Sequence, residues 1–141
     1  MQNLYFAYQY QPVPDGFPEQ ERQKLKDYRN TIQGISDELK PGKERRKVDE
    51  EIVRDVFLEE LDTILNNIGN LINSSGFDEI MDGLNTVYRL LSGAIDQLNA
   101  ALEGLEYMRN MGSYDSNIML QYYHCLDNCK INLDQIIPFL P

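Results

Sequence analysis

The residues best suited to metal or thiol chemistry lie in one short segment that holds His124, Cys125 and Cys129. In a helix, two cysteines four residues apart share one face, where their thiolates could bind a soft metal such as zinc. His124 would point about 100° away from that face, and a closed zinc site needs four ligands. Because the chain has one histidine and two cysteines, we interpret Cys125 and Cys129 as small apolar core residues. We therefore expect no metal and no cofactor, with these three residues as the alternative ligand set.

The sequence lacks the motifs that organise known kinds of active site. It has no phosphate-binding or dinucleotide-binding glycine loop, no zinc-protease motif, no nucleophile elbow and no EF-hand loop. The carboxylates of Asp82, Asp96 and Glu103 fall opposite an apolar stripe at helical spacing, which is typical of a solvated helix face. We therefore expect a protein that is not an enzyme.

A basic segment interrupts a chain whose formal net charge is -10. Its basic side chains are Lys40, Lys43, Arg45, Arg46 and Lys47. Such a segment is typical of a solvated turn whose bases pair with nearby acids. The alternative is a docking patch for an acidic partner or for a nucleic-acid backbone. The acidic balance of the whole chain argues against nucleic acid and against anionic lipid as partners.

Apolar residues at helical spacing predict the fold class. An unbroken 4-3-4-3 pattern runs through Phe77, Met81, Leu84, Tyr88, Leu91, Ile95, Leu98, Leu102 and Leu105. A helix with such a stripe needs other helices to cover it, and similar patterns predict helices at about 18–39, 44–73, 78–111 and 115–137. Short connections favour antiparallel neighbours. The sequence therefore predicts an all-α, antiparallel four-helix bundle with two long central helices, preceded by a non-helical aromatic arm at residues 1–17.

The predicted helix lengths point to an interface, because the two central helices would measure roughly 45–50 Å and the outer two about 33 Å. The far tip of the central pair would then lack cover, and it carries Ile68, Leu71, Ile72, Phe77, Ile80 and Met81. The aromatic arm carries Tyr5, Phe6, Tyr8 and Tyr10. One alternative is that the chain ends fold back on the tip and complete the core of a monomer. The other is a homodimer in which two tips pack together or two arms exchange.

The composition, with 42% hydrophobic and 26% charged residues, is typical of one soluble domain. The sequence shows no secretory signal, no apolar span and few cysteines, so we expect a cytoplasmic location and no membrane contact. We predict a non-enzymatic protein-interaction module, such as an adaptor, a regulator or a small acidic chaperone, that forms a homodimer. The alternative hypothesis is a sensor that binds a small molecule or metal between the helices at 78–111 and 115–137, near Tyr88, Tyr122, Cys125 and Cys129.

Overall fold

The protein is helical throughout the part that the computed structural model describes, which is residues 18–39, 50–74 and 81–141. The elements are α2 (Glu19–Glu38), α3 (Glu50–Ile52), the π-helical turn η2 (Val53–Phe57), α4 (Leu58–Asn73), α5 (Met81–Met111), α6 (Ser116–Ile136) and the 3-10 turn η4 (Ile137–Phe139). The backbone stays helical from α3 through η2 into α4. These elements confirm an all-α protein with four main helices, two of which, α5 and α6, pack closely together.

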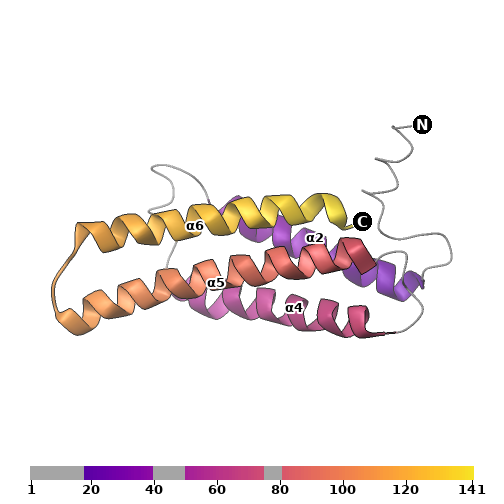
Figure 1. Ribbon diagram of the computed structural model, residues 1–141, viewed down its shortest axis with the longest axis horizontal. Coiled ribbons are helices and arrows are strands. Elements are labelled where there is room, and N and C mark those ends of the chain that lie inside the picture. Colours follow the sequence, from indigo (N-terminus) through magenta and orange to yellow (C-terminus); the bar gives the residue numbers. More distant parts are fainter. Residues whose placement is uncertain (1–17, 40–49, 75–80) are drawn as a thin grey trace.

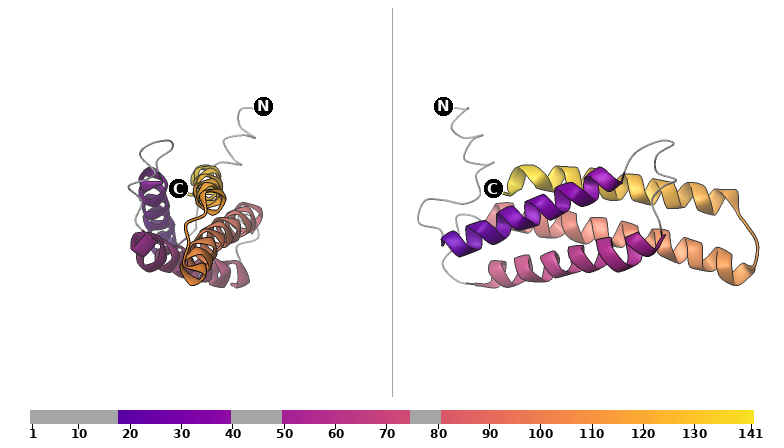
Figure 2. Two further views of the ribbon diagram at one scale, coloured as in Figure 1. Left: turned by 90° about the vertical axis from the view of Figure 1, so that its left-hand side faces the viewer. Right: turned by 180° about the vertical axis from the view of Figure 1, so that it is seen from behind.

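The pair formed by α5 and α6 is the frame of the fold. Figure 1 shows α6 returning alongside α5 after the connection at residues 112–115. Helix α4 packs on α5, and α2 packs chiefly on α6. Both views in which the long axis is horizontal show the connected end of the α5–α6 pair extending past α2 and α4 (Figures 1 and 2).

Each helix turns its predicted apolar stripe into one shared core. Helix α2 contributes Leu25, Ile32 and Ile35; the α3–α4 stretch contributes Val53, Phe57, Leu61, Ile64 and Ile68; α5 contributes Leu84, Val87, Leu91, Ala94, Ile95, Leu98 and Ala101; α6 contributes Tyr122, Leu126, Cys129, Leu133 and Ile136. Three residues of the predicted stripe are not fully buried: Leu102 and Leu105 are partly buried, and Tyr88 is 40% exposed while the neighbouring Val87 is buried. The Tyr88 ring lies against Gly69 of α4, 3.2 Å from where a Cβ would stand.

The π-helical turn lets the start of the α3–α4 stretch join the core. Val53 and Phe57 are four residues apart, as are Phe57 and Leu61, and all three are buried. A regular α-helix would rotate a run of four-residue steps off one face, whereas the wider π turn holds them closer to it. The turn therefore compensates for a sequence whose spacing does not match the α-helical period.

The connection from α5 to α6 follows the capping rules that its sequence indicates. Gly112 has a φ of 69°, and its N–H donates to the carbonyls of Met108 and Arg109 at 3.0 and 3.2 Å. The Asp115 carboxylate then accepts hydrogen bonds from the backbone N–H groups of Asn117 and Ile118. Glycine thus ends α5 and aspartate begins α6, both in the roles expected of them.

The observed helix lengths leave the connected end of α5 without cover from α2. Helix α5 has 31 residues, α2 has 20 and α6 has 21. Because α2 begins beside the end of α4, near Pro18 and Ser74, its 20 residues run out before α5 does. The C-terminal turn η4 packs against α2 and α5, and Leu140 is only 4% exposed. The prediction of a bare tip is therefore wrong for Ile68, which is fully buried.

Parts of the prediction lie outside the described residues. These are the aromatic arm at residues 1–17, the predicted helix start at residues 44–49 and the predicted helix start at residues 78–80. Within the described ranges, no helix combines the length and apolarity that crossing a bilayer requires.

A first prediction concerns two glycines in contrasting surroundings. Gly34 lies in the exposed part of α2, and a Cβ there would meet nothing within 4 Å. Gly34→Ala should raise the free energy of unfolding by about 1 kcal/mol because alanine is the better helix former. Gly112→Ala should lower it by about 1 kcal/mol because its φ of 69° strains any side chain. Urea unfolding of the two variants checks this, and equal shifts of one sign would contradict it.

Candidate functional site

The side of the bundle between α2 and α4 is open and forms a groove. Two adjoining surface hollows of about 490 and 480 Å³ lie there, and both are lined by Tyr28. The first is also lined by Asp27, Thr31, Asp55, Val56, Glu59, Glu60, Thr63 and Ile64. The second is also lined by Pro18, Glu21, Lys24, Asn67, Asn70, Leu71 and Ser74. We call these residues together the α2–α4 groove.

The groove stays open because the residues on its two walls do not attract one another. Around the first hollow, Asp27 of α2 stands among Asp55, Glu59 and Glu60 of the η2–α4 stretch. Like charges on facing helices repel. Helix α2 and helix α4 accordingly touch only sparingly. The result is an acidic hollow at one end that continues into a hollow with mixed charges and amides.

The apolar groups of the groove lie between these polar walls. Tyr28 and Leu71 are half-buried and Ile64 is almost fully buried. Val56 is 41% exposed although its neighbours Val53 and Phe57 are in the core. An apolar strip flanked by charge is the surface that an amphipathic helix recognises.

A polar cluster fixes the α2 wall to α6. Ser36 of α2 is fully buried, and its hydroxyl donates to the Asp134 carboxylate of α6. The Lys130 ammonium donates to the Ser36 carbonyl at 2.8 Å and to its hydroxyl oxygen at 3.0 Å. Lys130 also lies 3.8 Å from the Asp134 carboxylate. A buried serine with charged partners therefore sets where α2 sits along α6.

An ion cluster fixes the other wall to α5. Arg109, in the last turn of α5, donates to both carboxylate oxygens of Glu50 at 2.9 and 2.8 Å. Arg54 donates to one of the same oxygens at 2.6 Å. The hydrogen bond from Arg109, joined by that from Arg54, lowers the pKa of the Glu50 carboxyl against the opposing effect of partial burial. The two walls are thus anchored separately, one on each helix of the frame.

The predicted interface residues have different positions. Ile68 belongs to the core, Leu71 lines the α2–α4 groove, and Ile72 is half-buried against the core. The helix α5 begins at Met81, whose side chain is not described. The predicted residues outside the described ranges are Phe77, Ile80, the arm residues Tyr5, Phe6, Tyr8 and Tyr10, and the basic residues Lys40, Lys43, Arg45, Arg46 and Lys47.

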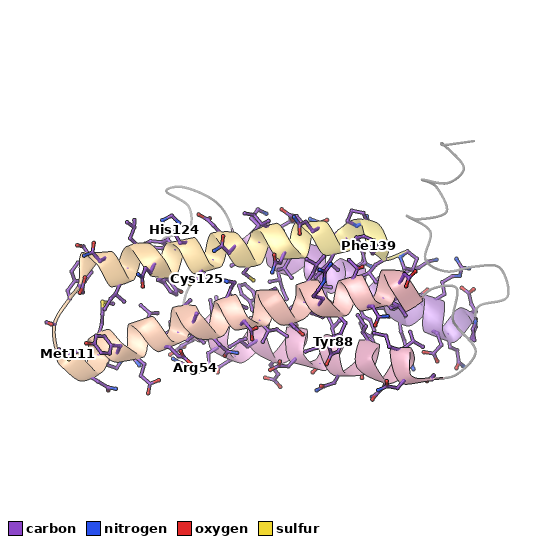
Figure 3. The ribbon with its side chains drawn as sticks, viewed as in Figure 1. Arg54, Tyr88, Met111, His124, Cys125 and Phe139 are labelled. Carbon is purple, nitrogen blue, oxygen red and sulfur yellow. The ribbon has the colours of Figure 1, made fainter. Side chains whose placement is uncertain are left out.

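The cysteines and the histidine lie on different sides of α6. Figure 3 shows His124 on the outer side of this helix and Cys125 on the side toward α5. Cys129 is completely buried, and burial raises the pKa of its thiol from 9.0 to about 12, while a smaller burial raises that of Cys125. Among the described residues, no three His, Cys, Asp or Glu side chains are grouped so that they could hold a metal ion. Cys129 thus packs as a core residue.

The residues of the alternative sensor hypothesis are not brought together. Tyr88 lies against Gly69 of α4, whereas Tyr122 and both cysteines belong to α6. Helices α5 and α6 approach closely at two glycines of α5. A Cβ on Gly93 would lie 2.7 Å from Asn132 Nδ2, and one on Gly104 would lie 3.3 Å from Ile118 Cγ2. The hollows described above lie between other helices.

Comparison with models of protein families, with curated proteins and with solved structures finds no match to this chain. The surface features of the molecule itself therefore carry the functional argument.

The sequence contained one usable indication of the groove that our prediction missed. Asp55, Glu59 and Glu60 follow one another at helical spacing on the flank of the stripe formed by Phe57, Leu61 and Ile64. That flank would normally pack against a neighbouring helix in a bundle. Carboxylates there indicate a side that none of the described helices closes.

A second prediction concerns the pH dependence of the Glu50 cluster. A carboxyl whose pKa is lowered on folding stabilises the protein above its ordinary pKa of 4.5, and this contribution is lost as the pH falls through the lowered value. Glu50→Gln should therefore lower the free energy of unfolding at pH 7 slightly, as for an exposed ion pair. The difference from the native protein should shrink as the pH falls below 4.5 and vanish once the pH is below the lowered pKa of Glu50. The control is Glu103→Gln, because Glu103 is an exposed carboxylate on α5. Unfolding curves recorded at several pH values give the free energy of unfolding of each variant.

A third prediction concerns the two thiols. At pH 8, Cys129 should react with an aromatic disulfide reagent more than about tenfold more slowly than Cys125, because it must first become exposed by unfolding. Cys125→Ser should therefore remove nearly all of the reaction in the native protein, and Cys129→Ser should leave it unchanged. Equal reaction of both single-cysteine variants without denaturant would contradict the buried position of Cys129.

Proposed function

We propose that this protein is a non-enzymatic interaction module that binds a basic, amphipathic helix of a partner protein in the α2–α4 groove. The observation that carries the proposal is the groove itself, in which half-buried Tyr28 and Leu71 lie between polar and acidic walls. Adaptor, regulator and small acidic chaperone are roles consistent with such a module. A cytoplasmic location and an antiparallel four-helix bundle framework are part of the same proposal.

The dimensions of the groove fit a single helix. Its η2–α4 wall extends from Asp55 to Ser74, a helical rise of about 28 Å. A bound helix of about five turns would cover this length and place an apolar residue every third or fourth position on the strip. Lysine or arginine on its flanks would then face the carboxylates.

The charge pattern favours a partner helix that is basic at one end. The carboxylates of Asp27, Asp55, Glu59 and Glu60 surround the first hollow, while Glu21 and Lys24 of opposite charge border the second. A uniformly acidic helix would be repelled at the first hollow. Complementary charge would chiefly raise the association rate and fix the direction of the bound helix.

The predicted aromatic arm and the residues at the start of α5 remain proposals for additional contact area. Tyr5, Phe6, Tyr8 and Tyr10 are of the residue type that dominates interface energies. Pro18, which precedes the first residue of α2, lines the second hollow.

The fourth prediction tests the groove with a defined probe. The probe is a fluorescently labelled, 18-residue helical peptide (about the length of the groove) composed of leucine, alanine and lysine. The native protein should bind it with an affinity that decreases as salt is added. Asp55→Lys combined with Glu59→Lys should raise the dissociation constant by about tenfold. Fluorescence anisotropy measures the binding.

The matched control is Asp96→Lys combined with Glu103→Lys, which makes the same change in net charge on exposed positions of α5. This variant should bind the probe with the affinity of the native protein. A control peptide with glutamate in place of lysine should bind neither the native protein nor this variant. Equal weakening by both double variants would mean that the overall charge attracts the peptide, and the groove proposal would then be wrong.

A further inference from the structure

The connected end of the α5–α6 pair has an apolar surface that the other described residues, 18–39, 50–74, 81–101 and 122–141, do not cover. We call residues 102–121 the hairpin end; they comprise the last ten residues of α5, the connection and the first six residues of α6. Every residue of the hairpin end keeps part of its surface exposed, whereas buried core residues stop at Ala101 on α5 and resume at Tyr122 on α6. The apolar stripe of α5 thus continues past the helices that cover it elsewhere.

Large apolar side chains are concentrated on this surface. Tyr107 is 58% exposed, Met111 is 61%, Tyr114 is 76% and Leu120 is 59%. Figure 3 shows Met111 at the extreme end of α5, on the part of the frame that extends past α2 and α4. Exposed aromatic and methionine side chains gathered in this way are typical of a contact surface rather than of a solvated helix face.

The outer part of the hairpin end, residues 107–121, carries no net charge within a strongly acidic chain, whereas Glu103 and Glu106 lie at its inner edge. Between Tyr107 and Leu126 the charged residues are Arg109 and Asp115, one of each sign. The Arg109 guanidinium is paired with Glu50, and the Asp115 carboxylate caps α6. Two copies of a chain with a net charge of -10 repel one another over most of their surface. At residues 107–121, where the two charges balance, that repulsion is weaker.

The hairpin end is also held in shape before any partner arrives. Ile118 of α6 packs onto Gly104 of α5, the Asp115 N–H donates to the Met108 sulfur at 3.3 Å, and Gly112 closes the last turn of α5. A surface that is already ordered loses little conformational entropy on binding. This favours association through the hairpin end as it stands.

We propose that the hairpin ends of two copies of this chain pack together and form a two-fold symmetric homodimer. Two helices from each copy then build a second, intermolecular four-helix bundle, continuous with the first. A self-complementary surface closes on itself under two-fold symmetry, so association stops at the dimer. The hairpin end, at 20 residues, is at the lower limit of the roughly 20–30 residues per side of a stable interface. The dimer is therefore a concentration-dependent one.

This dimer is distinct from the predicted homodimer through the α4–α5 tip or the aromatic arms. It uses the opposite end of α5, and it leaves the α2–α4 groove open to its proposed partner helix. The two proposals therefore succeed or fail separately.

The fifth prediction tests this dimer with the full-length chain by sedimentation equilibrium over a concentration series. The native protein should show a monomer–dimer equilibrium. Tyr107→Glu combined with Met111→Glu should raise the dimer dissociation constant by about thirtyfold, because each substitution places a negative charge in the contact between the two copies. Circular dichroism should stay unchanged, since neither residue is in the core.

Ile131→Glu is the matched control, because Ile131 is a comparably exposed apolar residue of α6 at 53% that lies outside the hairpin end. The dimer dissociation constant of this variant should equal that of the native protein. The dimer dissociation constant of the groove variant, Asp55→Lys with Glu59→Lys, should also be unchanged. A native protein that is monomeric at every concentration would overturn the proposal. A Tyr107→Glu, Met111→Glu variant that still forms the dimer would also overturn it. So would a dimer that is lost when residues 1–17 alone are deleted, because that result would identify the N-terminal arm as the contact.

Discussion

The close packing of α5 against α6 is the interaction on which the rest of the structure depends. Gly93 and Gly104 have no side chain, so α6 can approach α5 closely at these two points. A Cβ on Gly93 would collide with Asn132 of α6, and one on Gly104 would press on Ile118. Because these glycines are on the longest helix, they bring the two helices together at points well separated along it. The remaining helices attach to this pair. Helix α4 attaches to α5, and α2 attaches to α6.

This order of attachment explains both the α2–α4 groove and the exposed hairpin end. Since α2 and α4 are held by different members of the pair, nothing requires them to meet, and the carboxylates on their facing sides keep them apart. The polar anchors have the same arrangement, with Ser36 joined to Lys130 and Asp134 of α6, and Glu50 joined to Arg109 of α5. Both attached helices are also shorter than α5, so the frame extends beyond them.

Much of the fold follows from the sequence because apolar spacing reports directly on helices. The predicted limits 18–39 and 115–137 differ from α2 and α6 by one residue at each end, and Gly112 and Asp115 have their expected capping roles. What the sequence could not show is how the helices are aligned along one another. Periodicity determines which face of α2 is buried, but its position along α6 depends on the buried Ser36 and its charged partners, 94 and 98 residues away. The alignment of the helices therefore leaves an apolar surface at the connected end of α5 and α6, which the helix spacing alone does not indicate.

The candidate site was less predictable for the same reason. A groove is a relation between two helices, and no spacing within α2 or within α4 specifies it; only the carboxylates on the flank of α4 indicate it. The hairpin end, in contrast, is formed by helices adjacent in sequence, so the balanced charge of its residues 107–121 could have been read from the chain alone. The two surfaces also differ in the forces that act on them. Salt screens the acidic walls of the groove, whereas the hairpin end relies on apolar area, which screening does not weaken. Salt therefore separates helix binding from self-association in one and the same protein.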